Sequence, residues 1–233
     1  MHSSFVDYEY ILKRDFEEII KHMNTIYTEK RVDESKKILK NLHKSLWVII
    51  IWNIEMKKKY PGIVFFRGLI SNLISSLHII IIRDAKMLNF MERNSIEIFL
   101  RFIIALTDNT KTNEKPSNMF CFLFDKYKKQ NYIHDNLQKI KNIYSIVSEN
   151  IHSTTYIPDQ PYECLIDYND YYSDELLNEA TNKYINIIRY FNNILVNLEL
   201  KTFLGIDIKR QSIIRDFMWK EDLDSLLSLI NRK

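Results

Sequence analysis

Apolar side chains recur every three or four positions along most of the chain, the spacing that places them on one face of an α-helix. The pattern predicts helices over residues 6–27, 33 or 35–60, 63–87, a stretch ending near 107, 118–130, 135–152 and 173–200, and then two short helices that begin near 210 and 221. The helix over 63–87 is apolar almost all round, so we expect it to be buried on most sides.

Polar stretches separate the predicted helices. Pro61 and Gly62 end one helix, and the run DNTKTNEKPSN, which begins at Asp108, is typical of a loop. Asp135 is a predicted N-cap, because a short polar side chain accepts the first free backbone N–H groups of a helix. Residues 153–173 lack helical spacing and are rich in Pro, Asp and Tyr. Long irregular segments of this kind are often binding loops.

The low count of turn-forming residues favours a helical fold. The chain has 233 residues, of which 46% are hydrophobic, but only three glycines and four prolines. That is too few for a many-stranded sandwich or barrel. The sequence therefore predicts an all-α, antiparallel multi-helix bundle over residues 1–201, with an appendage of short C-terminal helices over residues 202–233.

The charge is unevenly spread. The formal net charge of +3 is too small for the whole chain to act as a polycation towards nucleic acid or membrane. Lysines concentrate at 36–59 and at 126–141, whereas residues 159–179 contain acidic side chains and no lysine or arginine. The asymmetry suits pairing between subunits or attraction of phosphate, although solvated helix faces are the simpler explanation.

Cysteine usage and hydropathy indicate a soluble cytoplasmic protein. Cys121 and Cys164 are the two cysteines, and no CxxC occurs, which argues against a disulfide framework or a zinc site. The start, MHSSFVDYEY, has no basic segment followed by an apolar one, so no signal peptide is predicted. The apolar runs are shorter than the ~20 residues that cross a bilayer, so no membrane segment is expected.

Two short polar signatures interrupt the helical pattern. At 3.6 residues per turn, each places its polar groups on one helix face beside residues that should enter the core. Polar groups at a core boundary need partners, so the two faces are expected to meet in one mixed cluster. The signatures are RNSIEIFLR, with Arg93, Glu97 and Arg101, and YSIVSENIH, with Ser145, Ser148, Glu149 and His152.

These residue types suit a ribonuclease that needs no metal. Such an enzyme requires a group that deprotonates the ribose 2′-hydroxyl, a group that protonates the leaving oxygen and a cation for the charged phosphorane. His152, a glutamate and an arginine supply them, and no cofactor or metal is required. The alternative is structural: Arg93 pairs with Glu97 one turn on, and His152 with Ser148 joins two helices by hydrogen bonds.

Several other patterns are weaker. Glu149 and His152 spell ExxH, which carboxylate-bridged di-iron bundles use twice, but a second ExxH is missing, so no metal site is predicted. The run DIKR at 207–210 resembles a nuclease motif without the strands that such a motif needs. FCFLFDKYKK at 120–129 offers aromatic rings and lysines to nucleic acid, although its helical spacing favours core packing.

A polar strip on the third predicted helix is a further candidate. The strip could line a pocket, but serines on a buried helix more often return their hydroxyls to the backbone, and a lone histidine there is more often a satisfied core residue. It consists of Arg67, Ser71, Ser75 and His78.

The two signatures carry a family resemblance. A helix with R-x-x-x-E-x-x-x-[LR], followed by a later helix with Y-S-x-x-S-E-x-x-H, resembles the helical abortive-infection proteins of bacteria that are grouped with the HEPN superfamily, over about residues 35–200. The resemblance implies an antiparallel helical bundle, often a dimer, in phage defence or toxin systems. In active members it implies RNA cleavage without a metal.

By this likeness, the positions of interest are Arg93, Glu97, Ser148 and His152, and Arg101 adds a second phosphate-binding cation. In active members, four to six residues separate an arginine from a following histidine. No arginine of this chain meets that spacing, since seven residues separate Arg14 from His22. The expected partners are RNA, a second copy of the chain, and a protein bound through residues 153–173. A non-catalytic helical adaptor or regulator is the alternative function.

Overall fold

A computed structural model describes residues 8–60, 64–107, 109–152 and 174–231, and within these ranges the chain is helical with no strand. The predicted all-α multi-helix bundle is thereby confirmed. The proposed binding loop at 153–173 lies outside the described residues.

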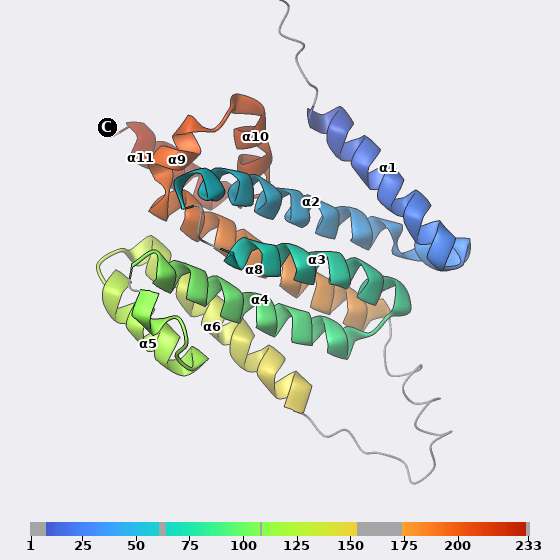
Figure 1. Cartoon of the computed structure of the whole chain (residues 1–233), viewed down its shortest axis with the longest axis horizontal. Coiled ribbons are helices and arrows are strands. Elements are labelled where there is room, and N and C mark those ends of the chain that lie inside the picture. Colours follow the sequence, from blue (N-terminus) through green and yellow to red (C-terminus); the bar gives the residue numbers. More distant parts are fainter. Residues whose placement is uncertain (1–7, 61–63, 108, 153–173, 232–233) are drawn as a thin grey trace, which may run out of the picture.

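The chain forms a series of α-helices and one short 3-10 turn (Figure 1). In chain order these are α1 (Tyr8–Ile26), α2 (Glu29–Lys59), α3 (Phe65–Ile82), α4 (Ala85–Ala105), η1 (Asn109–Lys111), α5 (Pro116–Tyr127), α6 (Asn131–His152), α8 (Asp174–Leu198), α9 (Leu200–Gly205), α10 (Ile208–Asp216) and α11 (Lys220–Asn231).

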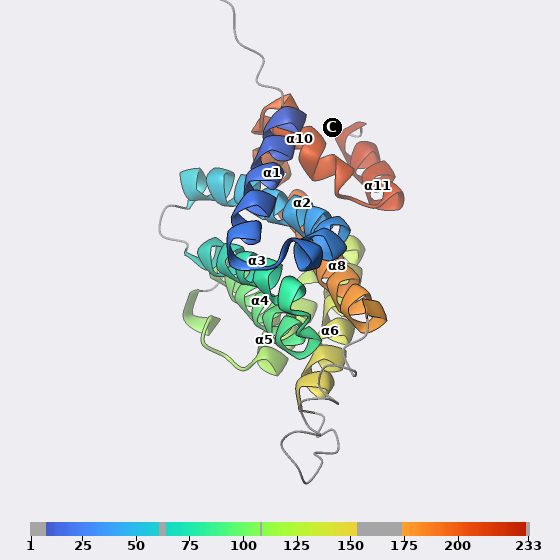
Figure 2. The same ribbon diagram turned by 90° about the vertical axis from the view of Figure 1, so that its right-hand side faces the viewer.

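The bundle is built from α2, α3, α4, α6 and α8, and the other helices lie around it. α3 packs between α2 and α4, α4 also packs on α6 and α8, and α8 returns to α2. α1 lies along the outside of α2, and α5 covers the end of the α4–α6 pair (Figures 1 and 2). The C-terminal helices gather on the side away from α5.

Large aromatic side chains from distant helices meet in the core. Phe99 of α4 stacks on Phe191 of α8 with ring centroids 3.8 Å apart, and Phe66 of α3 meets Phe102 edge-on at 4.7 Å. All four side chains are fully buried. Such contacts bury a large apolar area and favour one packing arrangement, which fixes α3, α4 and α8 relative to one another.

The turn between α3 and α4 corrects the predicted helix over 63–87. α3 ends at Ile82, and Arg83 adopts φ 63, which is left-handed backbone. The Asp84 side chain then accepts the Met87 N–H at 2.8 Å and caps α4. Because Arg83 is not a glycine, the left-handed turn has no obvious sequence signal.

Other boundaries also differ from those predicted. α2 begins at Glu29, a turn before the expected caps at 33 or 35, and α6 begins at Asn131 rather than at Asp135. The short helix α9 interrupts the segment after α8 and was not predicted. Terminal turns depend on local hydrogen bonds more than on apolar spacing, which explains these differences.

The third helix is less enclosed than predicted. Ile74 and Ile82 are 46% and 50% exposed, respectively. Among the described residues, α3 alone is long and apolar enough to cross a membrane, and half of that stretch is buried inside the bundle. The core helix of a soluble protein can have the same length and hydropathy.

Gly68 permits the close packing of α3 on α4. A Cβ atom at this position would lie 2.9 Å from Cδ1 of Ile98. A side chain would therefore force Ile98 to move or the helices to separate, which is the reason for a glycine inside an otherwise apolar helix.

Candidate functional site

The two helices that carry the polar signatures, α4 and α6, pack against each other. Arg93, Glu97 and Arg101 are spaced four residues apart, so they form one stripe along α4. α6 packs against α4 and carries the second signature from Tyr144 to His152. Tyr144, at the start of the second signature, contacts the α4 stripe through Glu97.

Glu97 is the centre of the cluster. Its Oε1 atom accepts a hydrogen bond from Arg93 Nε at 3.2 Å and another from the Tyr144 hydroxyl at 2.9 Å. Its Oε2 atom lies 3.9 Å from Arg101 Nη1, and Arg101 Nε also donates to the Thr112 carbonyl at 3.2 Å. The Glu97 carboxylate therefore joins two arginines of α4 to a tyrosine of α6.

The cluster is partly open to solvent. The side chains of Arg93, Glu97 and Arg101 are 30%, 20% and 31% exposed, respectively. Two guanidinium groups share one carboxylate, so the three side chains together carry one excess positive charge. Guanidinium groups suit anions, because their N–H donors match the oxygen atoms of a phosphate or carboxylate.

The contacts also set the protonation of the cluster. Burial raises the pKa of Tyr144, and its hydrogen bond to Glu97 raises it further, so the phenol keeps its proton. Burial lowers the pKa of Arg93, but the contacts with Tyr144 and Glu97 outweigh this effect and the net direction is upward. Tyr144 is thus a hydrogen-bond donor that positions Glu97, and Arg93 stays charged.

The other residues of the second signature do not form one hydrogen-bonded group with this cluster in the described part of the chain. The Ser148 hydroxyl is buried and has no hydrogen-bond partner within the described part of the chain. The Ser145 hydroxyl donates to the Lys141 carbonyl at 3.3 Å, and Glu149 is exposed. His152 is the last residue of α6, and its side chain lies outside the described residues.

The structure therefore brings together Arg93, Glu97 and Arg101 and adds Tyr144, which the sequence did not assign to the site. Tyr144 was predicted as part of the inner stripe of its helix. Its position four residues before Ser148 places both on one face, which was the available signal. The buried, unpartnered Ser148 hydroxyl lies one turn along α6 from the Tyr144 position.

Lysines and aromatic rings extend the cluster towards α5. Lys111 Nζ lies 4.4 Å from the centroid of Phe122, and Lys141 Nζ lies 5.3 Å from that of Phe124. Phe120 is buried and meets the Tyr144 ring edge-on at 5.8 Å. In the aromatic stretch at 120–129, Phe120 therefore packs in the core. Phe122 and Phe124 are only partly buried and lie beside lysines.

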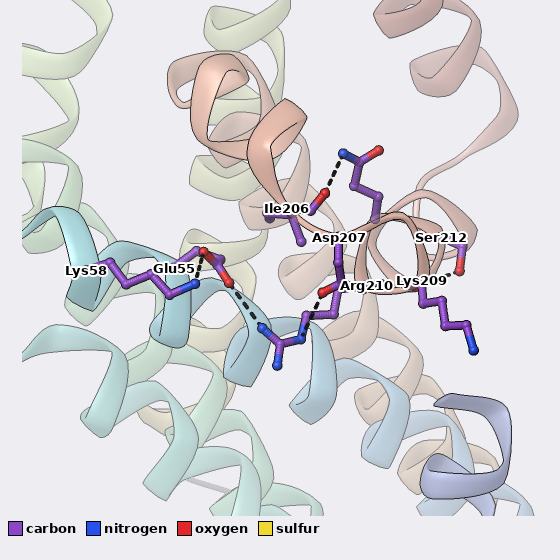
Figure 3. Close-up of polar contacts among 8 residues, drawn as sticks. Glu55, Lys58, Ile206, Asp207, Lys209, Arg210 and Ser212 are labelled. Carbon is purple, nitrogen blue, oxygen red and sulfur yellow. Dashed lines mark hydrogen bonds and ion pairs between the residues drawn. The ribbon is translucent and has the colours of Figure 1, made fainter. Parts of the chain in front are cut away.

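The run at 207–210 has a structural role. Asp207 caps α10 by accepting the Arg210 N–H at 3.1 Å, and its carboxylate lies 3.3 Å from Arg210 Nε. Arg210 also reaches Glu55 of α2 at 3.2 Å, and Lys58 binds the same glutamate at 2.7 Å (Figure 3). These ion pairs fasten α10 to α2.

The polar strip on α3 does not form a site. Arg67 and Ser71 are exposed, and His78 Nδ1 lies 3.1 Å from the Tyr27 hydroxyl, which joins α3 to the end of α1. Within the described residues, no three His, Cys, Asp or Glu side chains are placed to hold a metal ion.

A buried carboxyl group in the core was also missed. Glu92 of α4 is fully buried, and neither of its oxygens has a hydrogen-bond partner in the described chain. Burial raises its pKa from 4.5 to about 8, with Lys183 opposing the shift and Glu179 adding to it. A neighbouring polar chain links Asn72 to Ser95 at 3.0 Å and Ser95 to the Tyr184 hydroxyl at 2.7 Å.

Comparison with known proteins gives no relative. No protein-family model matches the chain, and no curated protein or solved structure matches it. The HEPN resemblance thus stays a prediction from two short motifs.

Proposed function

We propose that the α4–α6 face binds the phosphate backbone of RNA and that the protein cleaves RNA there without a metal ion, as a phage-defence or toxin-type protein. The observation that carries this proposal is the sharing of one carboxylate by two partly exposed guanidinium groups. Guanidinium groups bind phosphate oxygens through charge-assisted and often paired hydrogen bonds.

The surroundings of the cluster support a single-stranded substrate. Phe122 and Phe124 are only partly buried, and each has a lysine over its ring. Proteins that bind single-stranded nucleic acid combine cations along the backbone with aromatic rings on which bases stack. A strand crossing α5 towards Arg101 would meet both kinds of group.

In the proposed reaction, the ribose 2′-oxygen attacks the adjacent phosphorus, and the bond from phosphorus to the 5′-oxygen of the next nucleotide breaks. His152 takes the 2′-hydroxyl proton as general base and delivers it to the leaving 5′-oxygen. Arg93 stabilises the added charge of the phosphorane, and Glu97 and Tyr144 hold Arg93 in place. Arg101 binds a neighbouring phosphate of the strand. The products are a 2′,3′-cyclic phosphate and a 5′-hydroxyl.

The proposal is tested with purified protein, a labelled single-stranded RNA and EDTA. Arg93→Gln should weaken RNA binding by about tenfold, because it removes a charge-assisted contact. His152→Ala should abolish cleavage and leave binding largely intact. Arg67→Gln is the matched control, since Arg67 is an exposed arginine of α3, a helix that contributes no residue to the cluster.

Each result has a clear meaning. Cleavage in EDTA that depends on His152 supports the ribonuclease. RNA binding that depends on Arg93 without any cleavage reduces the proposal to an RNA-binding protein. Equal binding by wild type, Arg93→Gln and Arg67→Gln would exclude the cluster as an RNA site.

A second candidate function is a non-catalytic adaptor. Ile82, Met87 and Phe90, close in sequence around the α3–α4 turn, are 50%, 44% and 51% exposed, respectively. Exposed apolar groups of this size often mark a protein-binding surface. An adaptor predicts that wild type and His152→Ala inhibit host growth equally and leave total RNA intact, while Phe90→Ser removes the effect.

A further inference from the structure

A separate cleft lies between α2, α8 and α10. It has a volume of about 330 Å³ and is lined mainly by polar side chains. In both views α10 lies on the opposite side of the bundle from α5, so this cleft is distinct from the α4–α6 face (Figures 1 and 2). The residues that concern its chemistry are Asn41, Lys44, Asn182, Asn186, Arg189 and Asp216.

Arg189 is the most unusual of these groups. Its guanidinium lies 5.4 Å from the ring centroids of both Phe217 and Trp219, which hold it in place. Nη1 donates to the Asn186 side-chain oxygen at 3.3 Å, but Nε is buried and has no hydrogen-bond partner among the described residues. Burial lowers the pKa of Arg189, and no described carboxylate forms an ion pair with it.

The hydrogen-bonding capacity of the Arg189 guanidinium is therefore not fully used within the described residues. A guanidinium carries five N–H donors and gains most when they meet a planar or tetrahedral oxyanion. Arg210, by contrast, meets that need with a carboxylate, since it pairs with Glu55 at 3.2 Å. Arg189 instead lines a polar cleft without an ion pair to any described carboxylate.

The other lining groups suit a small polar anion. Lys44 adds a second cation from α2 and is exposed. Asn41, Asn182 and Asn186 supply amide groups, which bind oxygen and nitrogen atoms of a ligand. Asp216 is the one acidic side chain on the lining, so the cleft carries a net positive charge.

We propose that this cleft binds a small organic phosphate of the size of a mononucleotide, with its phosphoryl group between Arg189 and Lys44. The amides of Asn41, Asn182 and Asn186 hydrogen-bond the rest of the ligand, and Asp216 accepts from a ligand hydroxyl or amino group. The volume lies at the small end of the range of ~300–1,000 Å³ for small-molecule sites. This inference does not depend on the proposed RNA cleavage.

Binding is measured by calorimetry on the full chain with adenosine 5′-monophosphate, ribose 5-phosphate, inorganic phosphate and adenosine. Both phosphate esters should bind more tightly than inorganic phosphate, and adenosine should bind at least about tenfold more weakly than its monophosphate. Lys44→Gln should weaken binding of the esters by about fivefold. Lys40→Gln, an exposed lysine one turn earlier on α2, should leave it unchanged.

Arg189→Gln should abolish binding, while Arg189→Lys, which keeps the charge but loses the planar fork, should retain a weak fraction. Because Arg189 packs on two rings, the melting temperature of each variant is measured alongside, and Lys44→Gln gives the same test at an exposed position. Failure of both phosphate esters to bind, or equal binding by wild type and Lys44→Gln, would overturn the proposal. RNA cleavage by wild type and Lys44→Gln is compared separately and should be equal.

Discussion

Glu92 and Arg93 are adjacent in the chain but occupy opposite environments. Glu92 is fully buried, whereas the Arg93 side chain is 30% exposed. One residue of helix rotates a side chain by about 100°, so the register of α4 decides which charged group enters the core. The apolar spacing placed Arg93 and Glu97 correctly on a boundary face, but it did not signal that Glu92 lies inside.

Glu92 makes a pH-dependent contribution to stability. The folded chain holds its proton up to about pH 8, whereas the ordinary pKa of this group is 4.5. Between these values the folded chain binds more protons than the unfolded chain, so stability falls as pH rises from about 4.5 to about 8. Glu92→Gln should therefore raise the free energy of unfolding by about 1–3 kcal/mol at pH 9 and change it little at pH 5.

Urea unfolding of wild type and Glu92→Gln at both pH values measures this difference. Glu175→Gln is a useful control, because it changes an exposed glutamate of α8 that is not among the causes of the Glu92 pKa shift. A wild-type stability that stays level between pH 5 and pH 9, relative to the variant, would contradict a buried protonated Glu92.

Tyr144 supplies a second test at the residue scale. Tyr144→Phe removes the hydroxyl that donates to Glu97 at 2.9 Å but keeps the ring that packs on Phe120. We expect a loss of about 0.5–1.5 kcal/mol in the free energy of unfolding. RNA binding should weaken modestly, since Arg93 loses its positioning and keeps its charge. Tyr127→Phe, which alters another buried tyrosine of this region, controls for a general loss of stability.

At the scale of single elements, the sequence predicted which segments are helical better than where they end. The long helices follow from apolar spacing, because each must bury a stripe against its neighbours. The break after Ile82 depends instead on the Asp84 cap and on an Arg83–Glu34 ion pair at 2.9 Å. The Tyr144–Glu97 contact could not be predicted from the sequence either. A contact between two helices depends on how they are aligned along each other, which apolar spacing within one helix does not give.

α1 is attached to the bundle through α2. It packs on α2, where Asp15 accepts hydrogen bonds from His43 at 2.7 Å and from Trp47 at 2.9 Å. Burial lowers the pKa of His43, and the contact with Asp15 only partly opposes this. The folded chain thus keeps a neutral imidazole to lower pH than the unfolded chain, whose pKa is 6.5.

Stability should therefore fall as pH drops below about 6.5, where the unfolded chain binds the extra proton. Urea unfolding at pH 7.5 and pH 5.5 should show a larger loss for wild type than for His43→Gln, which keeps a hydrogen-bond donor and does not titrate. Trp47 fluorescence follows α1 docking in the same samples. An equal loss in both proteins would show that His43 is not responsible.

At the scale of the whole molecule, the C-terminal helices share the core of the bundle. Phe203, Ile206 and Ile214 are buried within the same hydrophobic cluster as Trp52. Trp52 Nε1 donates to the Asn192 side-chain oxygen at 2.8 Å, and the Asn192 amide donates to the Ile214 carbonyl at 3.1 Å. A polar chain thus runs from α2 through α8 to α10.

Ion pairs reinforce this attachment at the end of α2. Glu199 is buried, and it accepts hydrogen bonds from Lys59 at 2.6 Å, from the Tyr60 hydroxyl at 3.0 Å and from Thr202 at 2.8 Å. A second pairing joins Arg210 to Glu55 (Figure 3). Buried charges that are paired in this way become costly when one partner is removed.

Removal of residues 202–233 tests whether the segment is an appendage or part of the core. The truncation exposes apolar surface on α2 and α8 and leaves Glu55 without Arg210, so the shortened chain should lose at least about 4 kcal/mol of stability or aggregate. Phe217→Ala in the full chain, a milder change of the same contact, should cost about 3–5 kcal/mol. Full-length protein should unfold in urea in one transition by both fluorescence and circular dichroism. Two separate transitions, or a truncated chain as stable as the full one, would instead identify residues 1–201 as a bundle that folds independently.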